Sequence, residues 1–273
     1  MLNQSVDEFV DSFWPAPDEN LVKLRADHAK WFEYLNDTFG VQIVEEYSNL
    51  LIAFKDAPSE ISVRNLCKFL YENALGDEFS PDIARRGRQT LRSILGLLCP
   101  LEKHFTLIDL GCGDGRITLG AALYLKNLRQ AYAIDTLDSA LDCLEDRKNK
   151  STLEFESSGK IRGIKADYLR QEDQEKLYAL EHGFDVVLLS HPFLGIDKTL
   201  PPAAKLVKPD GRVIVAREYD KKSVEPVTEE TPNTIVQGYN EHAAPQGVHF
   251  KLYDSRSWND LVLLVAVGQK ASS

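Results

Sequence analysis

One stretch constrains the fold of this chain more than any other: Phe-Thr-Leu-Ile-Asp-Leu-Gly-Cys-Gly-Asp-Gly-Arg-Ile-Thr, residues 105–118. Its first half is a short apolar run, which predicts a buried parallel strand that carries an acidic residue, Asp109, near its end. Three glycines follow at alternate positions, Gly111, Gly113 and Gly115. A backbone without Cβ atoms can turn sharply there and approach a ligand closely. Because residues 116–128 are helix-forming, the pattern predicts a strand, a glycine turn and a helix whose free N–H groups face the crevice at the strand's carboxyl end.

The spacing of these glycines separates two kinds of nucleotide ligand. The dinucleotide fingerprint is Gly-x-Gly-x-x-Gly, with a pyrophosphate on the helix start. This chain has Gly-x-Gly-x-Gly instead, and Asp109 and Asp114 place negative charge beside and within the loop. Such charges repel a pyrophosphate and suit a cationic ligand. A glycine-rich turn that has no function is the remaining alternative.

The stretch Leu-Ile-Asp-Leu-Gly-Cys-Gly-Asp-Gly-Arg resembles the first motif of the class I S-adenosylmethionine-dependent methyltransferases. Their ligand carries a sulfonium and an ammonium and has no phosphate. Residues 208–213, Lys-Pro-Asp-Gly-Arg-Val, resemble the family's Lys-Pro-Gly-Gly turn into the fifth strand, with Asp210 in place of one glycine. The resemblance covers about residues 100–268, and it implies an enzyme that uses S-adenosyl-L-methionine and releases S-adenosyl-L-homocysteine.

The resemblance also implies the fold class, and the alternation of patterns agrees with it. The expected fold is α/β: a Rossmann-like, doubly wound sheet of seven strands in the order 3-2-1-4-5-7-6, with the last strand antiparallel and a mostly helical N-terminal extension. Parallel strands joined by right-handed crossovers follow from alternating strands and helices. After the first strand, the expected strands are 131–135, 161–166, 184–190 and 212–216, the expected helices are 137–148, 172–181 and 198–206, and the closing antiparallel hairpin is 248–253 with 260–267.

The first hundred residues carry no motif that identifies a subfamily. Apolar spacing predicts one helix over 18–39 that stops at Gly40, and further helices over 60–75 and 81–98. Residues 41–55 fit either a helix or two strands around Tyr47-Ser48-Asn49, and the turn-forming residues favour a hairpin. We therefore predict two parts. Residues 1–100 form a mostly helical region that serves as a substrate-recognition or lid element, and residues 101–273 form the methyltransferase domain.

Composition limits the partners of this chain. Its formal net charge of −10 disfavours nucleic acid as the main partner. The four cysteines are scattered, with no spacing typical of a zinc site or a disulfide framework. We therefore expect no bound metal, and we expect the protein to reside in a reducing compartment. No apolar run approaches the ~20 residues of a membrane span, and the N-terminus lacks the pattern of a signal peptide. These features predict a cytoplasmic protein with no membrane partner, and they leave its oligomeric state open.

Strand ends supply the predicted cofactor residues. By the resemblance, Asp135 accepts hydrogen bonds from both ribose hydroxyls and Leu137 packs on the adenine, whereas an ordinary solvated aspartate is the alternative for Asp135. The resemblance places Asp167 at the adenine amino group, although a helix cap is also open, and it places Asp109 at the amino-acid end. The whole predicted cofactor site comprises Asp109, Gly111, Cys112, Gly113, Asp135, Thr136, Leu137, Ala166, Asp167, Tyr168 and Ser190.

The candidate catalytic residue lies where the fourth strand ends in Ser190-His191-Pro192-Phe193. Branches of the family that methylate bases and amides carry Asn or Asp, then Pro-Pro, then Tyr or Phe, at this place. Ser190 and His191 depart from that pattern, which puts methylation of a nucleobase or glutamine in doubt. A histidine here can take a proton from an amine or hydroxyl near neutral pH, although a histidine that only holds a loop is equally open. Tyr239 is the reserve candidate, with Tyr219 and His242.

Three functions remain open at this point. The favoured one is N- or O-methylation of a small molecule. The second is methylation of RNA or protein, with the N-terminal region as the recognition element. In that case a run of basic residues would help to bind the RNA or protein, although a solvated helix face is the plainer interpretation of them: Arg85, Arg86, Arg88 and Arg92. The third is a protein that binds S-adenosylmethionine without turnover.

Overall fold

The computed structural model describes residues 4–24, 27–57, 59–73, 81–150, 159–192, 195–220, 231–258 and 261–271. The chain divides into two compact units, residues 1–89 and 90–273. The division falls inside helix α7, Pro81–Leu98. A role of the N-terminal part in recognition, or as a lid, stays a prediction.

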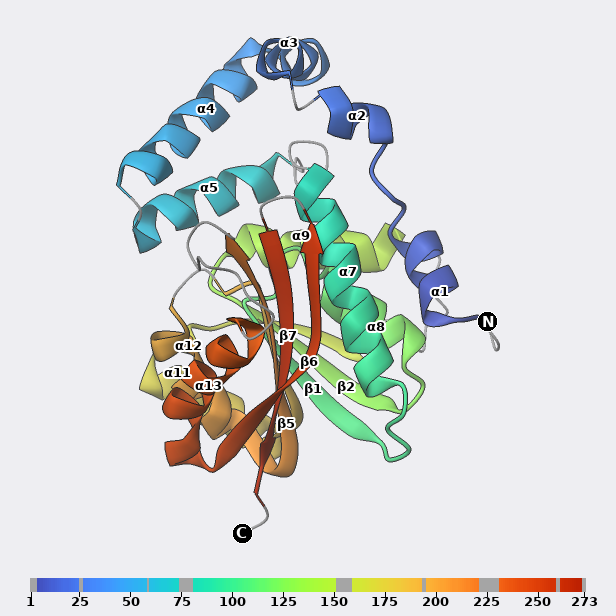
Figure 1. Ribbon diagram of the computed structural model, residues 1–273, viewed down its shortest axis with the longest axis vertical. Helices are drawn as coiled ribbons and strands as arrows, with labels where there is room; N and C mark the ends of the chain where they lie inside the picture. The colour runs from blue at the N-terminus through green and yellow to red at the C-terminus, as the bar shows by residue number, and fades with distance from the viewer. Residues whose placement is uncertain are drawn as a thin grey trace. The chain divides into compact units, whose positions relative to one another are not determined.

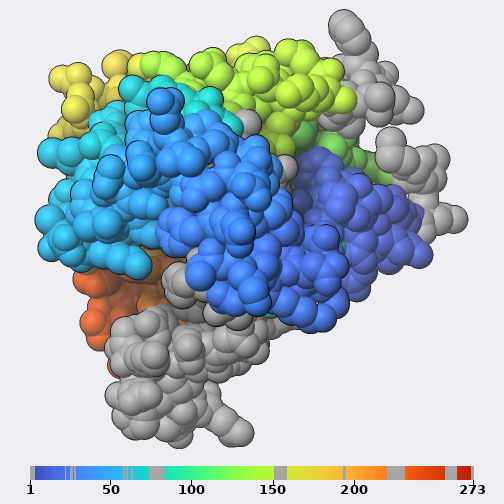
Figure 2. Space-filling model, turned by 90° about the horizontal axis from the view of Figure 1, so that it is seen from above, coloured from blue at the N-terminus to red at the C-terminus, as the bar shows by residue number. Residues whose placement is uncertain are grey.

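The described part of the first unit is helical. It contains α1 (Val6–Phe13), α2 (Glu19–Leu24), α3 (His28–Phe39), α4 (Val41–Asp56), α5 (Glu60–Glu72) and the first half of α7. Four buried side chains form one hydrophobic cluster of this unit: Trp31, Leu35, Val44 and Phe69. They come from α3, α4 and α5, whose side chains pack against one another in the space-filling view (Figure 2, blue to cyan). An amphipathic helix gains most of its stability from such packing.

Two predictions for this unit are wrong. Residues 41–55 form no hairpin, because they lie in the single helix α4. The Ser48 hydroxyl donates to the Val44 carbonyl 2.7 Å away, so a residue that favours turns is satisfied inside the helix. The single helix expected over 18–39 is also wrong, since α2 ends at Leu24 and α3 begins at His28, with the Asp27 carboxylate accepting from the Lys30 N–H.

Other predictions for this unit are confirmed. Helix α3 ends at Gly40, whose φ of 87° only glycine adopts easily, and α5 and α7 begin where expected. The sequence analysis missed α1, although Ser5 and Glu8 form a capping box at its start, a signal that is visible in the sequence.

The second unit is built on a sheet of seven strands in the order β3-β2-β1-β4-β5-β7-β6 (Figure 1). Strands β1 to β5 pair in parallel, and β7 runs antiparallel to both β5 and β6. The strands are β1 (Phe105–Leu110), β2 (Leu128–Asp135), β3 (Ile161–Lys165), β4 (Phe184–Ser190), β5 (Val207–Asp220), β6 (Val248–Trp258) and β7 (Leu261–Lys270). The predicted fold class and strand order are therefore confirmed.

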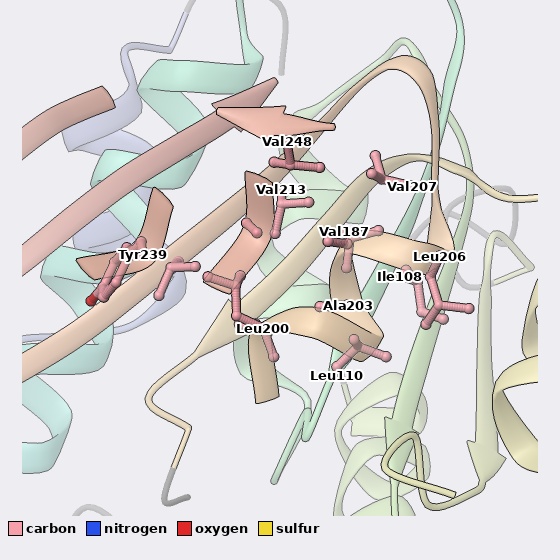
Figure 3. Close-up of a cluster of buried hydrophobic side chains, with 14 of the residues drawn as sticks. Ile108, Leu110, Val187, Leu200, Ala203, Leu206, Val207, Val213, Tyr239 and Val248 are labelled. Carbon is pink, nitrogen blue, oxygen red and sulfur yellow. The ribbon is translucent and has the colours of Figure 1, made fainter. Parts of the chain in front are cut away.

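Helices cover both faces of this sheet. Helices α11 (Gln171–Glu181), α12 (Ile196–Leu206) and α13 (Thr231–Ala243) pack on one face. Their side chains join those of the strands in a buried core that includes Ile108, Val187, Val213 and Leu200 (Figure 3). Helices α8 (Arg116–Tyr124) and α9 (Asp138–Lys150) and the second half of α7 belong to the other face. There Ser93 of α7 donates to Asp254 of β6 at 2.9 Å.

The main departures in this unit concern α8, β5 and α13. Helix α8 stops at Tyr124 because the next strand already begins at Leu128. The expected turn at residues 208–211 lies inside β5 as an irregularity, since Phe184 pairs with Val207 and Val186 with Arg212. Asp210 has a φ of 62° there, a conformation that aspartate tolerates better than most residues, in place of the family's glycine. Helix α13 had no counterpart among the predicted elements.

Candidate functional site

The glycine loop follows β1 and opens α8, as the sequence predicts. Gly111, Gly113 and Gly115 have φ values of 74°, 56° and 72°, which only glycine adopts easily. The N–H groups of Gly111 and Cys112 both donate to the Ile134 carbonyl, at 2.8 and 2.9 Å, so the loop is fixed to the end of β2. A Cβ at Gly111 would meet no described atom within 4 Å. The backbone is therefore open to a ligand on that side.

Asp135, at the end of β2, closes the loop from the other side. One oxygen of its carboxylate accepts from the Gly113 N–H at 3.0 Å, and the other accepts from the Leu137 N–H at 3.0 Å. Its carbonyl accepts from the Ala166 N–H at 3.1 Å. Asp135 thus holds both the glycine loop and the segment after β3 by hydrogen bonds, and its side chain is half-buried.

Asp109 lies under the loop and is fully buried. Its carboxylate accepts from the Thr118 hydroxyl of α8 at 2.6 Å and from the Ser190 hydroxyl at the end of β4 at 3.4 Å. Burial raises the pKa of Asp109 to about 6, against the two hydrogen bonds, and the negative charge of Asp135 adds to the rise. The Asp109 carboxyl can therefore change its protonation near neutral pH.

The second acid of the loop, Asp114, has its charge balanced within the chain. Arg116 Nε lies 3.0 Å and Arg147 Nη2 2.9 Å from its carboxylate. Burial raises the pKa of Asp114, and the charge of Arg147 opposes the rise. The interpretation of Asp114 as negative charge available to a ligand is therefore weakened.

The segment after β3 contains the remaining cofactor candidates. Asp167 accepts from the Leu169 N–H at 3.1 Å and pairs with Arg170 Nε at 3.3 Å, so it also supports the turn into α11. Ala166 and Tyr168 are half-buried against the core, and burial raises the pKa of the Tyr168 hydroxyl. The N-cap of α11 is Arg170, with no side-chain cap hydrogen bond, so Asp167 closes the turn before the helix and does not cap it.

His191 follows β4 in the left-handed region, with a φ of 52°. Its N–H donates to the Ala216 carbonyl of β5 at 2.7 Å. The ring nitrogen Nε2 lies 2.9 Å from the Thr90 hydroxyl of α7, and Nδ1 lies 3.8 Å from a carboxylate oxygen of Glu218 on β5. The sequence analysis missed Thr90 and Glu218. Glu218 lies just after the carboxyl end of a predicted strand, and the same kind of position identified Asp135 as a candidate. No local pattern in the sequence identifies Thr90. Phe193 lies outside the described residues.

Tyr239 occupies a different environment from His191. It belongs to α13 in the core on the opposite face (Figure 3), and only 2% of its surface is exposed. Its hydroxyl lies 2.5 Å from that of Tyr219, and burial raises the pKa of both. A phenol with a raised pKa is a poor proton acceptor near neutral pH. The other reserve, His242, is exposed on α13.

The carboxyl ends of β1, β2 and β4 thus meet around a glycine loop that is lined by carboxylates. A profile for the family described as "Methyltransferase domain" matches residues 101–260. The chain belongs to this family. It is an S-adenosylmethionine-dependent methyltransferase, and the carboxyl groups of Asp109 and Asp135 beside the glycine loop fit a cationic cofactor with ribose hydroxyls. Among the described residues, no group of three or more metal-binding side chains is found.

Solved structures agree on the fold of this methyltransferase. An O-methyltransferase family protein from Burkholderia thailandensis matches with a TM-score of 0.52 and 15% identity, over 100% of this chain and 90% of that one. The YcgJ protein from Bacillus subtilis matches with a TM-score of 0.50 and 10% identity, over 68% and 99%. The methyltransferase domain of bacterial CtHen1-CN matches with a TM-score of 0.51 and 16% identity, over 67% and 98%. In the described part of the methyltransferase, no helix is long and apolar enough to cross a bilayer.

Proposed function

We propose that this methyltransferase acts on a nitrogen or oxygen atom of a small molecule. The observation that carries the proposal is the end of β4, where Ser190 is hydrogen-bonded to the buried Asp109 and His191 takes the next position. Neither residue is the Asn or Asp acceptor of the branches that methylate bases and amides. An imidazole at this edge of the sheet suits an acceptor that must lose a proton near neutral pH.

The side chains around the glycine loop have separate roles in this proposal. Asp135 binds the ribose hydroxyls with Thr136 beside it, Asp167 binds the adenine amino group, and Asp109 favours the cationic amino-acid end. Bound S-adenosylmethionine supplies a methyl group on a positively charged sulfur, which is already activated for transfer. His191 holds the proton that the acceptor loses. The other contribution of the protein is to hold the acceptor close in a site that excludes water.

Methylation of RNA or protein is the second candidate, and one observation disfavours it. Arg88, in the middle of the basic run on α7, is buried and forms an ion pair with Asp11. A guanidinium in that position is not free to bind phosphate. The net charge of −10 acts in the same direction. Binding of S-adenosylmethionine without turnover is the third candidate.

Two measurements separate these candidates. Calorimetry with S-adenosylmethionine, S-adenosylhomocysteine and NAD tests the cofactor, and a preference for NAD would sink the assignment. Transfer of a labelled methyl group to a panel of phenols, carboxylic acids and amines, beside total RNA and protein extracts, tests the acceptor. Salt-sensitive labelling of RNA would favour the second candidate, and slow hydrolysis of the cofactor alone would favour the third.

A further inference from the structure

His191 is held by side chains from two elements that are far apart in the sequence. Thr90 belongs to α7 and Glu218 to β5, and all three residues belong to the second unit. Only 13% of the Glu218 side chain and 31% of the His191 side chain are exposed, and Thr90 is fully buried. The imidazole therefore has a defined partner at each nitrogen while one side of the ring stays open to solvent.

Sheet register explains why Glu218 faces this position. Ser190 pairs with Ala216 in the parallel ladder, and residues two apart on a strand share a face, so Glu218 lies one step beyond the end of β4 on that same face. The left-handed backbone of His191 turns the chain at this point, and its N–H bond to Ala216 fixes the turn. A histidine in this conformation is strained, and strain of this kind persists where surrounding contacts hold it.

The chemistry of the two partners selects one protonation pattern of the ring. A carboxylate only accepts hydrogen bonds, so Glu218 favours a proton on the nitrogen that faces it, Nδ1. Nε2 then carries the lone pair, and the Thr90 hydroxyl donates to it. At 3.8 Å the carboxylate oxygen lies beyond hydrogen-bond range but within ion-pair range, so its attraction grows when the ring becomes positively charged.

We propose that Glu218 is the positioning residue of His191. Its carboxylate keeps the proton on Nδ1 and stabilises the imidazolium, which forms when the acceptor's proton moves to the Nε2 lone pair. The acceptor keeps the electron pair and bonds to the methyl carbon, while the carbon–sulfur bond breaks and its electron pair stays on the sulfur of S-adenosylhomocysteine. Thr90 occupies Nε2 when no acceptor is present and gives way to it. This inference rests on the proposed function, since it assumes an acceptor that must lose a proton.

The charged and polar surroundings of the ring are consistent with this role. Glu218 faces it from β5 and Thr90 from α7, and on the β4 side Ser190 leads to the buried carboxyl of Asp109. Arg217, the neighbour of Glu218, has its guanidinium 5.5 Å from the centre of the Tyr219 ring. Tyr219 belongs with Tyr239 to the core on the opposite face.

The first test is acceptor-independent. In protein with isotope-labelled histidine, long-range proton–nitrogen spectra give the tautomer and the titration midpoint of His191, which is assigned by its loss in His191→Gln. In the wild type we expect the His191 ring to carry its proton on Nδ1. The proton affinity of the ring should be at least threefold lower in Glu218→Gln, and it should be higher in Thr90→Val. Glu102→Gln, the same change at an exposed acid, should leave the titration unmoved. Equal midpoints in the wild type and Glu218→Gln would overturn the proposal.

The second test separates a positioning role from a structural one. The pH profile of kcat/KM is measured with the compound of the acceptor panel that is methylated fastest. In Glu218→Gln its acidic limb should move with the midpoint seen by spectroscopy, while the affinity for S-adenosylmethionine stays within twofold. A profile that does not move would make the contact structural and refute the inference. If Glu218→Gln does not fold, Thr90→Val and Glu218→Asp provide the same comparison. Failure of the whole panel, with the midpoint shifted as expected, would refute the proposed function and support the contact.

Discussion

Gly115 provides a direct test of how the glycine loop is built. It has a φ of 72°, and a Cβ at this position would lie 2.4 Å from Leu144 Cδ1 of α9 and 2.9 Å from Leu144 Cβ. Gly111 has a similar φ of 74°, but a Cβ there would meet no described atom within 4 Å. The two glycines therefore share the conformational cost of an alanine and differ in the steric cost.

The magnitudes follow from this difference. A left-handed alanine costs about 1 to 2 kcal/mol, which is the whole cost that we expect for Gly111→Ala. Overpacking against the fully buried Leu144 adds about 1 to 3 kcal/mol, so Gly115→Ala should lose about 2 to 5 kcal/mol of unfolding free energy. At about 2 to 4 °C per kcal/mol for a domain of this size, the melting temperature of Gly115→Ala should fall by about 4 to 20 °C.

Urea unfolding followed by circular dichroism measures both single variants and the double variant Gly115→Ala with Leu144→Ala. Removing the Leu144 side chain makes room for the new methyl group, so the double variant should be about 1 to 3 kcal/mol more stable than the sum of the single losses predicts. Equal losses for the two glycines, or strict additivity in the double variant, would show that Leu144 does not pack on the loop as described.

Three further predictions concern the site. Asp135→Ala should weaken binding of S-adenosylmethionine by about 1 to 3 kcal/mol, about 5- to 150-fold in Kd by calorimetry, whereas Asp138→Ala, three residues later and with its carboxylate 70% exposed, should leave Kd unchanged. Because burial raises the pKa of Asp109 to about 6, the folded state binds this proton more tightly than the unfolded state does. The stabilisation that comes from this bound proton is therefore complete below about pH 4 and is lost as the pH rises through 6, about 3 kcal/mol in all. Thermal unfolding measured from pH 4 to 8 should show the wild type losing stability relative to Asp109→Asn over that window. Parallel stability curves for the two proteins would contradict the raised pKa. His191→Asn should retain cofactor binding and lose on the order of a hundredfold in turnover; full activity of this variant from pH 6 to 9 would make His191 a purely structural residue.

The sheet was predictable because its signals are local and repeated. Strand β4, Phe184–Ser190, has the bounds that its apolar run predicts, and the alternation of strands and helices fixes the handedness of each crossover. Residues 41–56 were not predictable in the same way, since Ser48 and Asn49 favour a turn in isolation. Packing of Val44 in the helical core decides in favour of the helix, and that packing depends on α3 and α5, which the local pattern does not contain.

Some residues of the candidate site could likewise be predicted from local sequence signals, and others could not. Asp109 and Asp135 could be placed from the sequence, because each stands at the end of a strand whose neighbours in the sheet were known from the order of elements. Thr90 and Glu218 could not be matched with His191. Their meeting depends on the path of α7 beside the sheet and on the register of β5 with β4, and neither is written in a motif.

The state of Asp135 also shows why a loop that is already hydrogen-bonded can still bind a ligand. An ionised carboxylate offers about four lone-pair directions. The Gly113 and Leu137 N–H groups take one on each oxygen, and in the proposed complex the ribose hydroxyls would donate to the same carboxylate without displacing either N–H group. The loop would then keep its conformation when the ligand binds, so no binding free energy would be spent on reorganising it. The same N–H groups would have to leave the carboxylate to reach a pyrophosphate, and this asymmetry favours a ligand that donates hydrogen bonds at this place.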